Sequence, residues 1–385
     1  MTSTRPQPKP REAVILALAG VTLAAYGCWI YTFGVFLDDL VADLGAREST
    51  VVAAFGAAQL IAGTGSVMAG RVLDRRGSAP VFATGIVGTF VLACSALATS
   101  ALTFFLLFSL GAGVVGATGF YHVSQTVAAR IAPGWETHAI TRLTLYAAFS
   151  APIYYPLAAW LVDLGGWRLA VSIPAATALA GFIIVLTMAS IAPSDRFGSH
   201  RLTASGFSGP ARRYAAGVVI AAGTIQLLSV YQVPVMVSAG LGLGVASTLA
   251  GARGVAQFLG RLPLVRIATR FGAARSLRGS MVLLTAGTAL LAAAGTVAMA
   301  ALAMLAIGLA IGAQSPLVGI RGREVFDEKI LGTALGTVTL GSFVAGAAMP
   351  VAAGALVDAT GSRLAAVALG AVGAAVAVML VGSGR

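Results

Sequence analysis

Charged residues are scarce in this sequence. Asp, Glu, Lys and Arg together make up 10% of its 385 residues, whereas apolar residues make up 58%. A soluble domain carries roughly 25% charged residues, so this chain has too little charge to cover a water-facing surface. Its apolar runs are long and continuous, which excludes the alternating pattern of an outer-membrane barrel. The composition therefore excludes a soluble enzyme or a disordered protein and indicates a polytopic helical membrane protein.

Cysteine is rarer still, and the common motifs of enzyme chemistry are missing. The two cysteines, Cys28 and Cys94, each lie inside an apolar run, so we interpret them as packing residues rather than as a disulfide or metal ligands. The sequence has no phosphate-binding Gly-Lys-Ser/Thr loop, no metal-ligand cluster and no nucleophile triad. We therefore expect no enzymatic activity and no cofactor.

The net charge of +12 is distributed as membrane orientation requires rather than as a nucleic-acid interface requires. If the N-terminus lies in the cytoplasm, 19 of the 25 Lys and Arg residues fall on inner loops and tails, and three fall on the outer side. We predict a multi-pass protein of the cell (inner) membrane with both termini cytoplasmic. Its surroundings are the lipid bilayer, and we expect no nucleic-acid partner.

Twelve runs contain about 20 mostly apolar residues, which is the length needed to span a bilayer. They lie near 13–37, 50–70, 79–99, 102–129, 139–162, 169–192, 214–239, 245–268, 277–297, 299–320, 331–357 and 363–382. We predict a cytoplasmic tail at 1–12, an N-terminal bundle at 13–192, a cytoplasmic linker at 193–213 and a C-terminal bundle at 214–385. The expected fold is an all-α polytopic membrane protein, a monomer with twelve transmembrane helices in two six-helix bundles.

The two halves repeat each other at an offset of 195 residues. Leu161-Val162-Asp163 matches Leu356-Val357-Asp358, and Arg71, Arg75 and Gly77 match Arg266, Arg270 and Gly272. Two separate blocks at one offset indicate an internal duplication. Duplicated six-span halves are typical of transporters, whose substrate site lies near the midplane between the halves.

A loop between the second and third spans reads Gly70-Arg71-Val72-Leu73-Asp74-Arg75-Arg76-Gly77. This order resembles the signature loop of the major facilitator superfamily, which has Gly, three residues, Asp-Arg, one residue and Gly. The resemblance implies the major facilitator fold and a conformational latch formed by Gly70, Asp74, Arg75 and Gly77. Gly70 would permit close helix approach, and Asp74 would face a helix N-terminus or an Arg. In the second copy, Val265 and Thr269 replace Gly and Asp, so we expect only the first latch to function fully.

Shorter motifs resemble the monocarboxylate and oxalate:formate transporter branch. They are Tyr31-Thr32-Phe33-Gly34-Val35-Phe36-Leu37, Gly260-Arg261 and Gly166-Trp167-Arg168. This narrower resemblance implies a small monocarboxylate substrate. The chain departs from the animal carriers of that branch at Gln257 and Tyr31, where they have an Asp and a basic residue. The departures argue against their proton-and-lactate mechanism.

Arg253 is the most informative polar residue, because it lies about eight residues inside the eighth span. An Arg at the bilayer centre costs roughly 2.5–3.5 kcal/mol on insertion scales. Arg253, Gln257 and Arg261 follow each other at i, i+4 and i+8, on one ridge of the helix. We predict that Arg253 faces a cavity and binds a carboxylate through two hydrogen bonds. The alternative is a structural Arg bonded to backbone carbonyls, and for Arg261, near the cytoplasmic mouth, we favour a structural or gating role.

Several further polar residues are candidates for the substrate site. His122, with Gln125 on the same face of the fourth span, could bind substrate or carry a proton, or could simply bond to a neighbour. Arg142 could contact substrate, or pair with Glu324, Asp327 or Glu328 as a cytoplasmic gate. Further cavity candidates by fold position are Tyr31, Gln226 and Gln314.

The middle of every predicted span lacks Asp and Glu, so the interior carries net positive charge. This favours an anionic substrate. We predict a secondary active transporter that moves a small organic anion, such as a monocarboxylate, by rocker-switch alternating access, with a proton as candidate co-transported ion. The alternative is a proton-coupled multidrug exporter of the same superfamily. The missing interior carboxylate argues against it, as does Phe149-Ser150-Ala151-Pro152 where a Gly-Pro exporter motif would lie. A membrane sensor would need a signalling domain, and the sequence shows none.

Overall fold

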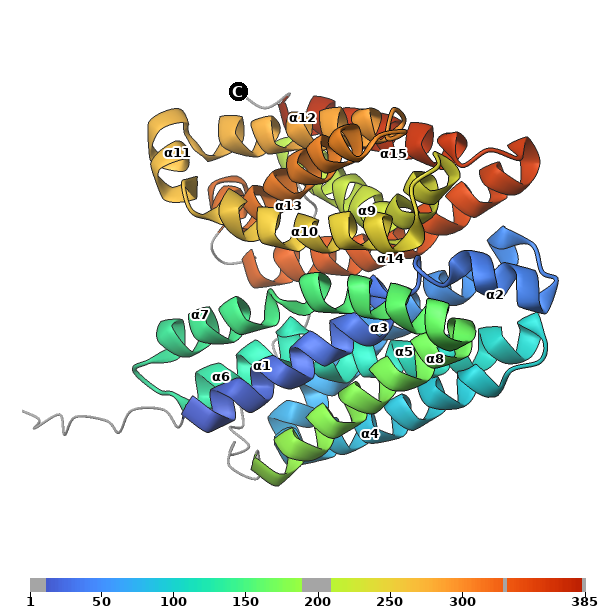
Figure 1. Ribbon diagram of the computed structural model, residues 1–385. Coiled ribbons are helices and arrows are strands. Elements are labelled where there is room, and N and C mark those ends of the chain that lie inside the picture. Colours follow the sequence, from blue (N-terminus) through green and yellow to red (C-terminus); the bar gives the residue numbers. More distant parts are fainter. Residues whose placement is uncertain (1–11, 189–208, 328–330, 383–385) are drawn as a thin grey trace, which may run out of the picture.

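The computed structural model describes residues 12–188, 209–327 and 331–382, and these residues form helices without any strand. Two bundles lie against each other, with α1 to α8 in one and α9 to α15 in the other (Figure 1). Nearly all of the predicted tail at 1–12 and most of the predicted linker at 193–213 fall outside the described residues. Each bundle comes from one half of the chain, as the duplication in the sequence predicts.

The elements of the first bundle are α1 (Glu12–Tyr26), η1 (Gly27–Tyr31), α2 (Leu37–Leu44), α3 (Glu48–Arg76), α4 (Ser78–Cys94), η2 (Ser95–Leu97), α5 (Ala101–Gly119), α6 (Tyr121–Ile131), α7 (Glu136–Ala147) and α8 (Ser150–Met188). The elements of the second bundle are α9 (Gly209–Ser238), α10 (Leu243–Arg261), α11 (Leu264–Phe271), α12 (Ala273–Leu291), α13 (Val297–Val325), α14 (Leu331–Thr360) and α15 (Leu364–Gly382).

The described helices account for twelve membrane crossings. Nine helical stretches among the described residues are long and apolar enough to span a membrane. One of these stretches, Glu136–Met188, supplies two crossings, because Gly165 and Gly166 break the helix between them. Helices α10 and α12, each of 19 residues with two arginines, supply the last two. The predicted count is therefore retained.

The first span differs from the predicted single helix over 13–37. The helix ends in a π-helical turn, η1, at Tyr31, and the separate helix α2 begins at Leu37. Gly27 packs against the ring of Tyr154, and Gly34 packs against the backbone carbonyl of Val230, with no room for a Cβ at either position. Close approach of α8 and α9 therefore shapes this segment, which hydrophobicity alone does not reveal.

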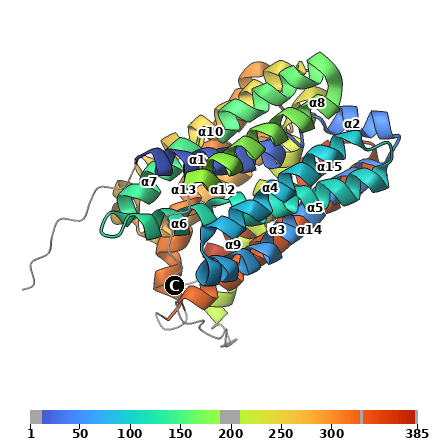
Figure 2. The same cartoon turned by 90° about the horizontal axis from the view of Figure 1, so that it is seen from below.

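Two seams join the bundles, one between α3 and α14 and one between α8 and α10 (Figure 2). A Cβ on Gly56 of α3 would lie 2.9 Å from the carbonyl oxygen of Ala347, and a Cβ on Gly254 of α10 would lie 2.7 Å from Cδ of Pro152. Helices in lipid associate through such small residues, because close backbone approach maximises van der Waals contact. The glycines of the sequence thus bring the two halves together around a common centre.

Ion pairs join the two halves at the end that the charge distribution assigns to the outer side, here called the outer end. Arg363, just before α15, pairs with Asp38 of α2 and lies 3.1 Å from the Glu48 carboxylate of α3. The Asp358 carboxylate of α14 accepts hydrogen bonds of 3.1 Å from the backbone N–H groups of Glu48 and Ser49, which begin α3. A carboxylate at a helix N-terminus is stabilising, so these contacts hold the outer end closed.

We expect Arg363→Gln to open the outer end. The substitution removes charge-assisted hydrogen bonds to Asp38 and Glu48, each worth about 1.5–3 kcal/mol. A loss of that size shifts a two-state equilibrium about tenfold or more toward the outward-open form. Spin labels on cysteines placed at the exposed Arg47 and Ser238, in opposite halves of the outer end, should report longer distances in electron spin resonance.

The matched control for this measurement is Arg168→Gln. Arg168 pairs with Asp43 at 2.7 Å, but both residues belong to the first half, so breaking this pair leaves the contact between halves intact. Hydrogen bonds from Trp167 and Arg168 lower the pKa of the Asp43 carboxyl. The labelled protein should carry Ala at Cys28 and Cys94 to remove the native thiols. Equal distributions of the distance between the two spin labels in both variants would contradict the role of Arg363 in holding the outer end closed.

Candidate functional site

A central cavity of about 260 Å³ lies between the two halves. The first half contributes residues of α1, η1 and α3, and the second half contributes residues of α9, α10, α13 and α14. Its lining residues are Tyr26, Ile30, Tyr31, Gln59, Ala222, Ile225, Gln226, Ser229, Arg253, Gln257, Ile311, Thr339, Ser342 and Phe343. Four of the predicted substrate residues come together here, namely Tyr31, Gln226, Arg253 and Gln257.

Arg253 supplies the positive charge of this lining. Its side chain is only 1% exposed, and Nε and Nη1 of its guanidinium have no hydrogen-bond partner among the described residues. Buried donors without an acceptor are costly, so Arg253 retains the capacity to bind an anion in the cavity.

Two glycines of α13 position the part of α10 that carries Arg253. A Cβ on Gly308 would lie 2.6 Å from the carbonyl oxygen of Arg253, and a Cβ on Gly312 would overlap the carbonyl of Gln257. The pair is four residues apart on one helix face, which is the small-residue spacing that lets membrane helices pack closely. Packing of α13 against α10 therefore holds both Arg253 and Gln257 at the cavity wall.

Amide side chains supply most of the remaining polarity of the central cavity. Gln59 of α3 lines the cavity, and both of its amide atoms lack a partner among the described residues. Gln226 of α9 lies close to Gln59, since both are near the position of a Cβ on Gly346. Gln59 is not among the site residues predicted from the sequence, although a single Gln inside an apolar span is a signal for such a residue.

Tyrosines form the wall of the cavity on the side of the first half. The ring of Tyr26 stacks on Phe120 at 4.0 Å between centroids, and the ring of Tyr31 lies 5.5 Å from that of Tyr155. The Tyr155 hydroxyl donates to the Ser229 carbonyl over 3.3 Å and accepts from the Gln232 amide. Because these hydrogen bonds cross from α8 to α9, they fix the aromatic wall relative to the second half.

Four predicted substrate residues lie outside the lining of the central cavity. His122 of α6 is hydrogen-bonded through Nε2 to the Ala117 carbonyl at 3.1 Å. This agrees with the alternative that His122 simply bonds to a neighbour. Gln125 is half-buried on the same helix, and Gln314 is buried within α13. Arg142 of α7 pairs at 2.5 Å with the carboxylate of Glu12, at the start of α1. None of the four lines the cavity in this conformation.

The predicted cytoplasmic gate is not assembled in this conformation. The carboxylate that pairs with Arg142 belongs to Glu12, and Glu324 pairs with Arg321 of its own helix at 2.7 Å. Arg261 is half-buried at the end of α10, and Asp327 is exposed after the end of α13. Glu328 lies outside the described residues. A gate formed by Arg142 with Glu324 or Asp327 stays a prediction for a state closed to the cytoplasm.

The predicted latch loop joins α3 to α6 through an ion pair. Arg130 of α6 pairs with Asp74 and donates a second hydrogen bond of 3.2 Å to the Leu73 carbonyl. Gly77, which caps α3 directly after its last residue Arg76, has φ of 79°, a conformation that favours glycine. Gly70 differs from expectation, because a Cβ there would meet nothing within 4 Å, so no helix approaches it closely here.

Comparisons with known proteins agree with this architecture. The family model of the Major Facilitator Superfamily matches residues 17–216 and again residues 214–383. Among solved structures, the nucleoside transporter NupG is similar, with a TM-score of 0.76, 15% identity, and coverage of 97% of this chain and 99% of that one. The D-xylose-proton symporter has a TM-score of 0.72 and 16% identity over 94% of this chain and 96% of that one.

A bacterial homologue of the human lysosomal transporter Spinster, in an inward-facing and occupied conformation, has a TM-score of 0.70 and 15% identity. The match covers 98% of this chain and 95% of the Spinster homologue. A search of curated proteins gives no match. Two repeated bundles around a central polar cavity define a membrane transporter rather than an enzyme. The chain belongs to the major facilitator superfamily.

Proposed function

We propose that the protein is a secondary active transporter that moves a small organic anion of the monocarboxylate class by alternating access. The observation that carries this proposal is Arg253, a buried cation at the central cavity whose Nε and Nη1 lack an acceptor among the described residues. The described cavity lining contains no carboxylate that could neutralise it. A guanidinium presents paired N–H groups that match the two oxygens of a carboxylate.

The rest of the lining suits a small anion with a short organic part. Gln257 and Gln226 line the cavity with Arg253, and their amides can bond to substrate oxygens. Tyr26 and Tyr31 offer an apolar wall with polar tips. The volume of about 260 Å³ favours a small substrate, since drug-sized ligands occupy pockets of roughly 300–1,000 Å³.

The contacts between the two halves support alternating access. The outer end is held closed by Arg363, Asp38 and Asp358, so substrate would exchange with the cytoplasm in this state. Rocking of the halves would break these outer contacts and bring Arg142 toward Glu324 and Asp327 at the cytoplasmic end. The described lining holds no carboxylate or histidine, so we assign no proton carrier within the cavity.

A ligand-stabilisation screen on the purified full chain tests the substrate class. A ligand that binds the folded state raises its stability by about 2.7 kcal/mol at 100 times Kd. We expect the monocarboxylates formate, acetate or lactate to raise Tm, and uncharged sugars and nucleosides to leave it unchanged. Stabilisation by lipophilic cations alone would overturn the anion proposal in favour of the multidrug exporter. Stabilisation by sugars or nucleosides alone would also overturn it.

A further inference from the structure

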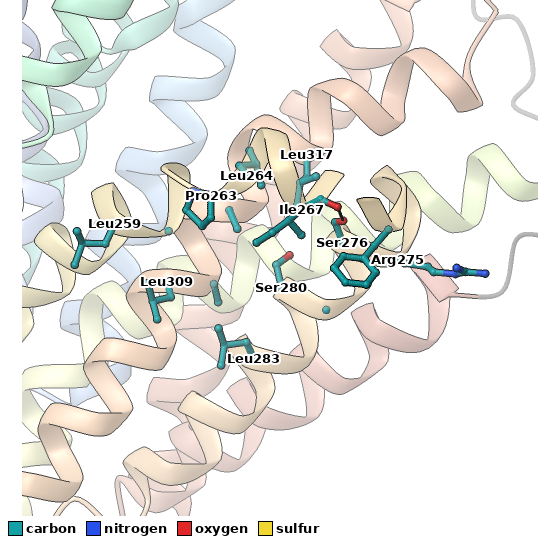
Figure 3. Close-up of a pocket in the computed structure, with 15 residues that line it drawn as sticks. Leu259, Pro263, Leu264, Ile267, Arg275, Ser276, Ser280, Leu283, Leu309 and Leu317 are labelled. Carbon is teal, nitrogen blue, oxygen red and sulfur yellow. Dashed lines mark hydrogen bonds between the residues drawn. The ribbon is translucent and has the colours of Figure 1, made fainter. Parts of the chain in front are cut away.

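A second cavity, here called the lateral cavity, lies within the second half and has a volume of about 510 Å³ (Figure 3). It is lined by the end of α10 and by α11, α12 and α13, and it shares no lining residue with the central cavity. Exposed apolar side chains line it, including Leu259 at 46%, Ile267 at 38% and Phe271 at 51%. Exposed apolar side chains on a membrane-spanning bundle face lipid, so this cavity opens toward the bilayer.

The lateral cavity is apolar at one end and cationic at the other. Leu259 and Leu309 lie at one end, and Arg275 lies at the opposite end with its guanidinium directed out of the cavity (Figure 3). The hydroxyls of Ser276 and Ser280 already donate to carbonyls of their own segment, over 2.8 and 2.7 Å. The charge of Arg275 is therefore the polar feature left for a ligand, and an elongated ligand with one anionic end fits this arrangement.

The charge around the lateral cavity is uncompensated. The segment 243–291 contains six arginines and no Asp or Glu. Arg270 and Arg275 form no ion pair with any carboxylate in the described part of the chain. In the first half the corresponding loop carries Asp74, which pairs with Arg130, whereas the second half has Thr269 at the matching position. Without a carboxylate at position 269, Arg270 and Arg275 form a basic cluster at the edge of the lateral cavity that the charge distribution assigns to the cytoplasmic side.

We propose that the lateral cavity binds an anionic phospholipid of the cytoplasmic leaflet. One acyl chain occupies the apolar part lined by Leu259, Leu283 and Leu309, and the headgroup phosphate lies at Arg275, with Arg270 nearby in the sequence. Basic pockets between helices on the cytoplasmic side of membrane proteins suit anionic headgroups, and each Lys or Arg near the surface contributes attraction to anionic lipid. This site is separate from the central cavity and does not depend on the identity of the transported substrate.

Thermal unfolding of the full chain in neutral detergent tests this site. Palmitoyl-oleoyl phosphatidylglycerol is compared with phosphatidylcholine of the same chains and with inorganic phosphate. Two variants target the lateral cavity, Arg275→Gln at its cationic end and Gly279→Leu in its lining, where a Cβ meets nothing within 4 Å and the new side chain fills the space. Matched controls are Arg212→Gln, at another exposed arginine, and Gly20→Leu, where a Cβ also meets nothing.

We expect phosphatidylglycerol to raise Tm by about 3 °C more than phosphatidylcholine in the wild type and in both controls. The difference should disappear in Arg275→Gln and in Gly279→Leu. Equal effects of the two lipids would overturn the proposal, and so would an equal effect of inorganic phosphate. An unchanged lipid effect in Gly279→Leu would exclude an acyl chain from the cavity. If a variant fails to fold, native mass spectrometry of the wild-type protein in equal mixtures of both lipids tests the proposal instead. The proposal requires that the protein retain phosphatidylglycerol in preference to phosphatidylcholine, and equal retention would overturn it.

Discussion

Replacing Arg253 with Gln is expected to abolish stabilisation by carboxylates and to reduce carboxylate uptake into proteoliposomes by about 10- to 100-fold. The substitution removes the positive charge of a guanidinium that is 1% exposed and lines the central cavity. Hydrogen bonds to a charged group contribute about 1.5–3 kcal/mol each, and 1.4 kcal/mol corresponds to a factor of ten in affinity. Uptake of radiolabelled carboxylate and the ligand-induced change in Tm measure the two effects separately.

Two controls separate substrate binding from folding in this experiment. Arg278→Gln removes the same charge from an exposed position on α12 and should leave uptake unchanged. Arg253→Lys keeps the charge but not the paired N–H geometry, so it should retain only part of the affinity. Without ligand, Arg253→Gln should unfold at the same or a higher temperature, because an unpartnered buried charge is costly. Normal carboxylate uptake by Arg253→Gln would contradict the assignment, and a large fall in its ligand-free Tm would indicate a structural arginine instead.

Replacing Gly312 with Val is expected to lower Tm by about 5–10 °C and to disrupt the central site. The new side chain would overlap the Gln257 carbonyl, so α13 could no longer approach α10. Overpacking of a close-packed interior costs about 1–3 kcal/mol when side chains can adjust, and here the obstacle is backbone. Thermal unfolding of the purified protein in detergent measures the effect.

Gly319→Val is the matched control for this substitution. Gly319 lies on the same helix, seven residues further along, and a Cβ there meets nothing within 4 Å. Both variants introduce the same β-branched residue into α13, so helix propensity cancels between them. Gly319→Val should unfold near the wild-type temperature. Equal Tm values for the two variants would contradict close packing of α13 on α10 as the source of stability.

Most of the fold could be predicted from the sequence, because hydrophobic length and charge bias act along the chain. The twelve crossings, the two bundles and the family follow from apolar runs, the repeat and the loop at Gly70–Gly77. The break after Tyr31 could not be predicted in this way. It depends on the approach of Tyr154 and Val230 to glycines of the first span, and those residues are distant in the chain.

The candidate site could be predicted only in part. Arg253, Gln257, Gln226 and Tyr31 line the central cavity, whereas His122, Gln125, Arg142 and Gln314 do not. A polar residue in an apolar helix can be recognised from the sequence, because placing it in the membrane costs free energy. Its position in the sequence does not say which neighbour it faces. His122 meets a carbonyl of its own bundle, and Arg142 meets Glu12.

The amino-acid sequence is enough to predict which segments enter the membrane, their expected orientation, and that a positive charge lies inside, because transfer from water to lipid depends on each segment's own composition. Which polar groups share a cavity depends on the packing of distant helices. Gln59 joins Arg253 across the two halves, and Leu259 and Arg275 lie at opposite ends of the lateral cavity, only because glycines let particular helices approach. Those contacts depend on shape complementarity between distant segments, which no single stretch of the chain encodes.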